Sequence, residues 1–104
     1  MTSWAKYHIE KLLKGETVSF RPSGSSMTPR IQSRQLCTVE PIFDHSLIEK
    51  NDVVLCRVSG NDYFHLVKAI QNKGESFLIA NNHGHDNGWT NSTKVFGKLI
   101  KIEN

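Results

Sequence analysis

Residues 23–29 form a turn of small side chains that ends in methionine, threonine and proline, and they read Ser-Gly-Ser-Ser-Met-Thr-Pro. A turn of this composition presents hydroxyl groups on a fixed backbone. Ser26 is a candidate nucleophile, because a serine attacks a carbonyl carbon once a neighbouring base removes its proton. The chemistry of such a pair is acyl transfer, and the base must come from another part of the chain.

Lys68 is the candidate base, and it lies in a segment with the composition of a β-strand. Residues 63–70 are rich in aromatic and branched side chains. Strand alternation places Lys68 on one face with Phe64, Leu66 and Ile70. Removal of a lysine from water lowers its pKa from ~10.4 by up to ~3 to 5 units. We therefore expect this lysine to sit among apolar side chains and to act as the base.

Five sequence blocks occur in the order found in one superfamily of peptidases. They are the serine box at 23–29, Asp-Val-Val-Leu-Cys-Arg at 52–57, Val-Lys-Ala-Ile at 67–70, Asn-Asn at 81–82 and Gly-Lys-Leu-Ile at 97–100. The chain thus resembles, over roughly residues 18–102, the superfamily of type I signal peptidases and LexA-type self-cleaving repressors. The resemblance implies a Ser/Lys dyad of Ser26 and Lys68, and a supporting role for the loop that carries Asn81 and Asn82.

Two features of that superfamily are not found in this sequence. Signal peptidases carry a membrane segment before the serine box, and no apolar run here approaches the ~20 residues that span a bilayer. The repressors cut their own chain at an Ala-Gly or Cys-Gly bond, and neither dipeptide occurs. We therefore expect a soluble serine endopeptidase that hydrolyses a peptide bond in trans. With no signal peptide evident, the simplest location is the cytoplasm.

Hydrophobic periodicity predicts one helix followed by a series of strands. Apolar side chains recur at spacings of three and four over residues 4–14, with Ser3 as a cap and Gly15 as the end of the helix. The predicted strands are residues 17–21, 35–40, 52–58, 63–70, 76–80 and 95–102.

Turn residues at 59–62 and 72–75 predict two hairpins between these strands. The expected fold is mainly β, a small, mostly antiparallel, partly open β-barrel of the LexA/signal peptidase type. An amphipathic helix in residues 1–15 would cover an opening or edge of the β domain formed by residues 16–104, within one compact domain.

Acyl transfer also needs hydrogen-bond donors for the oxyanion that develops on the substrate. The backbone N–H of Ser26 is the first candidate. Ser25 or Ser23 could supply a second donor from an N–H or a hydroxyl, although both are equally well explained as turn residues.

Several histidines offer alternative chemistry. His65 could be a base, but it stands three positions from Lys68 and would point to the opposite face of a regular strand. His83, His85 and Asp86 have a spacing that could provide metal ligands, but no zinc motif accompanies them. We favour a polar loop at 81–88 and expect no metal or cofactor.

The charge pattern bears on the partner. The chain carries a net charge of +3 with a pI of about 9.0, and its basic residues are scattered, which disfavours nucleic acid as a partner. If nucleic acid does bind, we expect the contacts at Lys11, Lys14, Arg21, Arg30 and Arg34.

A catalytically silent protein-interaction module on the same fold is the alternative to a peptidase. It would form a stable complex with a protein partner or with a second copy of itself. Cys37 and Cys56 fall in strand-like segments, so we expect two buried thiols rather than a disulfide.

Overall fold

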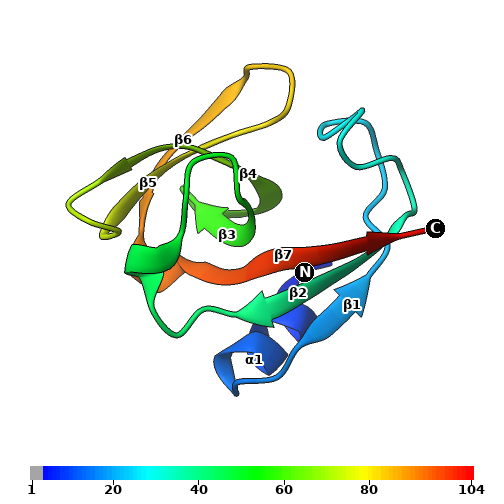
Figure 1. The fold of residues 1–104 in the computed structure, drawn as a ribbon, viewed down its shortest axis with the longest axis horizontal. Helices are drawn as coiled ribbons and strands as arrows, with labels where there is room; N and C mark the ends of the chain where they lie inside the picture. The colour runs from blue at the N-terminus through cyan, green and yellow to red at the C-terminus, as the bar shows by residue number, and fades with distance from the viewer. Residues whose placement is uncertain (1–3) are drawn as a thin grey trace.

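Seven β-strands and one α-helix account for most of the described chain. The computed structural model describes residues 4–104. Helix α1 (Lys6–Leu13) comes first, and two short 3-10 helices, η1 (His45–Leu47) and η2 (Ser92–Lys94), connect strands (Figure 1). The strands are β1 (Val18–Phe20), β2 (Leu36–Pro41), β3 (Val53–Val58), β4 (Asn61–Gln71), β5 (Ser76–Ala80), β6 (Asp86–Asn91) and β7 (Val95–Glu103). The mainly β composition predicted from the sequence is confirmed.

The strands form a single antiparallel sheet in the order β1-β2-β7-β3-β4-β5-β6. Its end strands, β1 and β6, do not pair with each other, so the sheet is not closed. The predicted antiparallel arrangement is therefore confirmed. Because the sheet is not closed, it is better described as a curved sheet than as a barrel.

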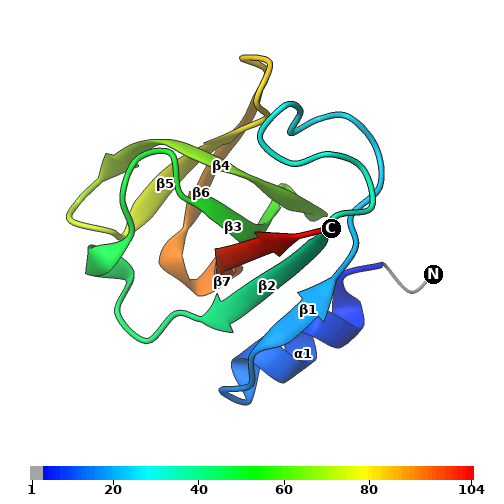
Figure 2. The same cartoon turned by 45° about the vertical axis from the view of Figure 1, so that its right-hand side comes forward.

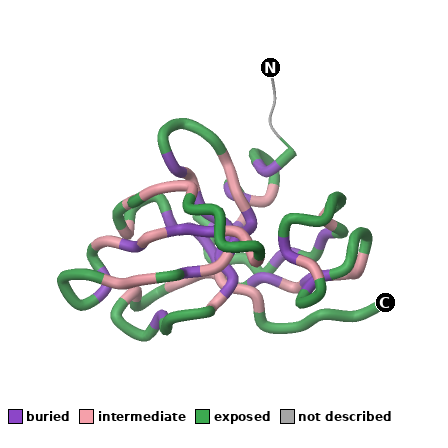
Figure 3. Tube along the Cα trace, turned by 90° about the horizontal axis from the view of Figure 1, so that it is seen from above, coloured by how far each residue is buried: buried purple, intermediate pink, exposed green. Residues whose placement is uncertain are grey.

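Two apolar clusters fill the interior on the two faces of the sheet. One lies under α1 and contains Ile9 and Leu12 with side chains from β1, β2 and β3. The other contains Phe77 and Ile79 of β5, with side chains from β3, β4 and the start of β7. The buried stretches of the trace run through the middle of the molecule in Figure 3. The helix thus covers one end of the sheet, as its amphipathic pattern predicts.

Gly97 allows α1 to pack closely against the sheet. A Cβ atom at this position would lie 2.6 Å from a Val39 methyl and 2.8 Å from a Leu12 methyl. Such distances are far shorter than van der Waals contact, so a larger residue would force the Val39 and Leu12 side chains to shift, and its Cβ would also lie 3.0 Å from the Glu40 carbonyl oxygen.

The helix is shorter than its sequence pattern predicts, and its last residue, Leu13, lies one residue before the predicted end. Gly15 adopts φ +84°, and its N–H donates to the Leu12 carbonyl at 2.9 Å. Glycine reaches this left-handed conformation without a steric penalty, which explains why the helix stops there. The predicted Ser3 cap lies outside the described residues.

Both predicted hairpins are present. Ser59 and Gly60 have φ of +50° and +82° between β3 and β4, a pair of positive angles typical of two-residue hairpin turns. Asn72, Lys73 and Gly74 also have positive φ between β4 and β5. The turn residues therefore fix the register of the central strands.

Strand β6 was not predicted, because its sequence carries weak strand signals. The polar loop expected at 81–88 is shorter, since β6 begins at Asp86. Asparagine, aspartate and glycine are disfavoured in strands, so this strand forms through its pairing with β5, where Trp89 lies opposite Leu78. This pairing places Asp86 opposite Ala80 and leaves Asn87 as the extra residue at the register shift.

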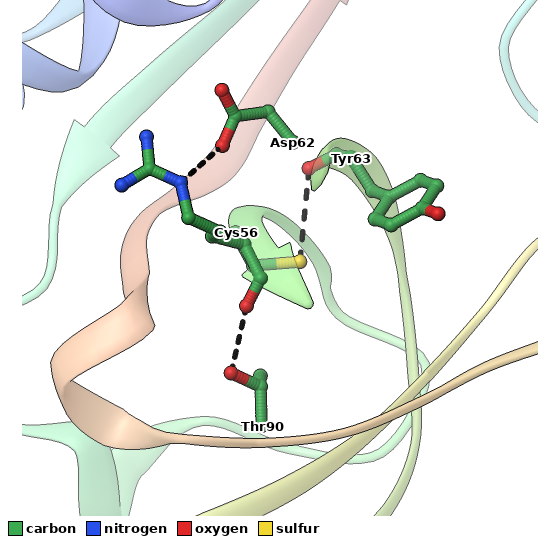
Figure 4. A network of polar contacts seen from close by, with 5 residues as sticks. Cys56, Asp62, Tyr63 and Thr90 are labelled. Carbon is green, nitrogen blue, oxygen red and sulfur yellow. Dashed lines mark hydrogen bonds and ion pairs between the residues drawn. The ribbon is translucent and has the colours of Figure 1, made fainter. Parts of the chain in front are cut away.

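Contacts beyond the strand ladder hold β6 and β4 against β3 (Figure 4). The Thr90 hydroxyl donates to the Arg57 carbonyl at 2.7 Å, and the Arg57 side chain pairs with Asp62 at 2.8 Å. The Cys56 thiol donates to the Tyr63 carbonyl at 3.7 Å. Strand β6 therefore has a fixed position across the curved sheet.

The two cysteines are free and buried, as predicted. Burial, together with the nearby Asp62 carboxylate, raises the pKa of Cys56 to about 12, and burial raises the pKa of Cys37. Both are packing residues.

Candidate active site

Three polar side chains from distant parts of the chain form a line of hydrogen bonds. The Ser26 hydroxyl lies 3.1 Å from Nε2 of His65, and Nδ1 of the same ring lies 2.7 Å from Oδ1 of Asn87. Ser26 stands in the turn after β1, His65 in β4, and Asn87 in β6. A serine, a base and a residue that orients the base are the parts of a nucleophilic triad.

The amide oxygen of Asn87 determines which nitrogen of His65 carries the proton. An amide oxygen can only accept a hydrogen bond, so Nδ1 of His65 is the donor. In the neutral ring, Nε2 then keeps its lone pair and accepts the hydrogen bond of the Ser26 hydroxyl. This is the tautomer that a general base for Ser26 requires.

His65 is buried, and burial is the main influence on its protonation. Burial lowers its pKa below the usual 6.5, the hydrogen bond with Asn87 opposes that effect, and nearby His85 lowers the pKa further. The ring is consequently neutral at pH 7 and able to accept a proton.

The turn that presents Ser26 is built from several local hydrogen bonds. The N–H of Gly24 donates to the Ser33 hydroxyl at 3.1 Å, and Gly24 has φ +99°. The Ser25 carbonyl accepts both the N–H of Thr28, at 3.2 Å, and the Thr28 hydroxyl, at 2.9 Å. A cis peptide bond joins Thr28 to Pro29. The hydrogen bonds hold the backbone on both sides of Ser26.

The loop between β5 and β6 packs against this turn. Figure 2 shows the loop beside the segment that follows β1. The N–H of Asn82 donates to the Ser26 carbonyl at 2.9 Å, and its side-chain amide donates to the Thr28 carbonyl at 3.0 Å. His83 Nε2 lies 2.8 Å from the Ser25 carbonyl and donates to it. The loop therefore helps to fix the position of Ser26 relative to His65.

Asn81 organises the loop itself. Its side-chain oxygen accepts the N–H groups of His83 and His85, at 2.8 and 3.0 Å. Asn82 therefore contacts the serine turn directly, whereas Asn81 stabilises the loop that positions Asn82.

The environment predicted for Lys68 is wrong. Its ammonium lies 2.7 Å from the Asp86 carboxylate, and its side chain is 46% exposed. Pairing between β4 and β5 runs from Val67 opposite Ile79 to Ala69 opposite Leu78, so Lys68 is the extra residue of a β-bulge. A bulge interrupts the alternation of side chains between the two faces of the sheet. Ile70 packs in the cluster that contains Phe77, and not with Phe64 and Leu66 as predicted. The Ser26 hydroxyl thus contacts His65, and Lys68 contacts Asp86.

Backbone donors for an oxyanion are present beside Ser26. Within residues 4–104, the N–H groups of Ser25 and Ser26 donate to no protein acceptor. Ser23 lines the cleft that opens at Ser26, whereas the Ser25 carbonyl is engaged by Thr28 and His83. The arrangement leaves an N–H at the nucleophile and a second donor one residue away or at Ser23.

A cleft of about 390 Å³ opens at Ser26 and His65. One wall is formed by the chain from Phe20 to Gly24 and the other by β4 from Asp62 to His65. Trp4 and His8 extend the cleft toward α1. Its size falls within the range of pockets that bind small molecules or a short segment of peptide.

Within residues 4–104, no group of three or more His, Cys, Asp or Glu side chains is arranged to hold a metal ion. His83 instead contacts the serine turn, and Asp86 pairs with Lys68. In the same part of the chain, no helix has the length and apolarity needed to cross a membrane.

Comparison of the sequence with models of protein families and with curated proteins finds no match. The chemistry of this site is therefore read from Ser26, His65 and Asn87 themselves.

Sequence reasoning found the serine but not the complete site. The sequence names His65 as a possible base but disfavours it, because it stands three positions from Lys68 and a regular strand would point the two side chains to opposite faces. Asn87 was missed altogether. A signal did exist in the sequence: histidine is a common base for serine, and His65 stands in the same predicted strand as Lys68.

Proposed function

We propose that the protein is a serine peptidase in which Ser26 is the nucleophile and His65, rather than Lys68, is the general base. The 3.1 Å contact between the Ser26 hydroxyl and Nε2 of His65 carries this proposal. That distance lies within the ~2.6 to 3.2 Å reach of proton transfer. The order of the sequence blocks shared with the signal peptidase and LexA-type superfamily supports the same reaction class and the same role for Ser26.

The reaction would proceed through an acyl-enzyme. As the Ser26 oxygen bonds to the substrate carbonyl carbon, its proton passes to Nε2 of His65. The imidazolium then gives this proton to the leaving amine as the peptide C–N bond breaks. A water molecule, deprotonated by the same nitrogen, attacks the ester and regenerates the Ser26 hydroxyl.

Asn87 acts as a positioning residue in this scheme. Its side-chain oxygen accepts the hydrogen bond from the Nδ1–H of His65, and this keeps Nε2 directed at Ser26. The N–H of Ser26, with a second donor at Ser25 or Ser23, would stabilise the oxyanion, an effect whose loss costs ~10² to 10³ in rate in other serine peptidases.

A peptide bond fits the cleft because one edge of β4 is open beside the site. Pairing between β4 and β5 begins at Leu66, so among the described strands the part of β4 that carries Tyr63, Phe64 and His65 pairs only with β3. An extended polypeptide can add to such an edge through main-chain hydrogen bonds. That position would carry its backbone past Ser26.

Digestion of a complex peptide mixture tests the proposal. The wild-type protein and its Ser26→Ala variant are incubated separately with peptides from a digested proteome, and new termini are identified by mass spectrometry. We expect new termini with the wild type alone. Identical mixtures from the two proteins at high concentration and long incubation would overturn the proposal and favour the protein-interaction module.

A further inference from the structure

The end of the cleft nearest α1 has an unusual lining of aromatic rings. The Phe20 ring stacks on His8 with centroids 4.7 Å apart and an interplanar angle of 25°. It also contacts Trp4 at 5.6 Å and Phe64 at 5.0 Å. All four residues line the cleft that opens at Ser26.

Trp4 is the accessible part of this aromatic surface. Its residue surface is 51% exposed, whereas Phe20 and Phe64 are buried. A large indole that is half exposed at the rim of a concave site is available to contact a ligand. The apolar surface is therefore concentrated at one end of the cleft, away from the polar residues of the triad.

His8 has a property that packing alone does not account for. Its Nδ1 is buried and has no hydrogen-bond partner within residues 4–104. Burial lowers the pKa of this ring, which keeps it neutral. Because Nδ1 is buried, only Nε2 is left to form a hydrogen bond with a molecule in the cleft. An N–H is costlier to bury unpaired than a lone pair, so the proton belongs on Nε2.

The charged side chains of the cleft are already engaged. Asp62 pairs with Arg57 at 2.8 Å, and Arg21 donates to the Arg34 carbonyl at 2.8 Å. Arg21 could still attract an acidic side chain, which makes an acidic ligand the natural competitor in a test. The concentration of rings at Trp4, His8 and Phe20 favours an aromatic one.

We propose that Trp4, His8 and Phe20 form a subsite that binds an aromatic side chain of the peptide substrate. The subsite rests on the proposed peptidase function, and it names the substrate class. The guest ring packs against Trp4 and His8, and the Nε2–H of His8 donates to an acceptor on the substrate, such as a main-chain carbonyl. Aromatic pairs gain more than burial alone provides, so we expect preference over an aliphatic side chain by about fivefold.

The test measures binding without hydrolysis, so that it does not depend on the activity. The Ser26→Ala protein, labelled with ¹⁵N, is titrated with the N-acetyl amides of phenylalanine, tyrosine, leucine and glutamate. The chain has two tryptophans, Trp4 in the subsite and Trp89 on β6, so two indole N–H signals report on two places. Trp89 lines a different cleft and is the internal control.

We expect the phenylalanine and tyrosine amides to shift the Trp4 indole signal saturably and to leave Trp89 unchanged. The leucine and glutamate amides should bind at least about fivefold more weakly. A His8→Leu variant should lose this preference while the rest of its spectrum stays that of the folded protein. Equal affinity for all four amides, stronger binding of the glutamate amide, or no saturable shift at Trp4 would overturn the subsite.

The outcome is separable from that of the peptidase proposal. If peptides are cleaved but the amides show no aromatic preference, the peptidase stands and the subsite is wrong. If the amides bind at Trp4 with aromatic preference and no peptide is cleaved, the pocket exists and the function assigned to Ser26 is wrong.

Discussion

Substitution of Asn87 by aspartate changes the charge beside His65 while keeping the shape of the side chain. Asn87 Oδ1 lies 2.7 Å from Nδ1 of His65. An aspartate oxygen at that place still accepts the Nδ1 proton, but it adds a negative charge. A carboxylate within ~4 to 6 Å stabilises the protonated ring and raises its pKa by ~1 to 3 units.

The sign of the effect on reactivity follows from the role of His65. Only the neutral ring can take the Ser26 proton, so reactivity falls as pH drops through the pKa of His65. In the wild type this pKa is lowered from 6.5, mainly by burial, so the acid limb lies below pH 6.5. In the Asn87→Asp variant the limb should move to higher pH by ~1 to 3 units.

Two measurements report the change. NMR titration of the His65 ring gives its pKa directly, and the rate at which a fluorophosphonate labels Ser26 gives the pH dependence of reactivity. Asn91→Asp is the matched control, because Asn91 is on the same strand and its Oδ1 also accepts an N–H, that of Thr93. It should leave both midpoints unchanged. An unchanged His65 midpoint in Asn87→Asp would refute the contact that defines the site.

Three further predictions concern stability and the lysine. Gly97→Ala should lower the free energy of unfolding by ~1 to 3 kcal/mol in urea denaturation, because the new methyl overlaps Val39 and Leu12; an unchanged midpoint would contradict the packing. Below about pH 6.5 the unfolded chain binds a proton at His65 before the folded protein does, so stability should fall on acidification, and His65→Gln should reduce that slope; equal slopes would argue against burial of this ring. Lys68→Met should leave the rate of Ser26 labelling within about threefold, because its exposed ion pair with Asp86 contributes only ~0 to 1 kcal/mol; loss of labelling would restore the lysine as the base.

The fold was largely predictable because its signals are local. Gly15 ends the helix, and the turn residues at 59–60 and 72–74 set the hairpins, each through backbone conformations that the sequence reveals. The core strands carry branched and aromatic residues. Strand β6 carries none of these signals except Trp89 and Thr90, so its existence depends on pairing with β5, which no local rule reports.

The site was predictable only at Ser26. Strand alternation assumes a regular strand, and it cannot reveal the bulge that leaves Lys68 unpaired with β5 and exposed beside Asp86. Asn87 could not be predicted as part of the site, because its strand, β6, could not be predicted from the sequence. An asparagine in a polar segment gives no sign of its partner until β6 is placed.

Covalent labelling of Ser26 across pH tests the central claim most directly. The purified wild type is treated with a fluorophosphonate between pH 5 and 9 and analysed by intact mass, beside the Ser26→Ala, His65→Gln and Lys68→Met variants. We predict one adduct at near-neutral pH in the wild type and in Lys68→Met, and none in the other two. Labelling that survives in His65→Gln but is lost in Lys68→Met, or a wild type that reacts no faster than Ser26→Ala at any pH, would contradict the account.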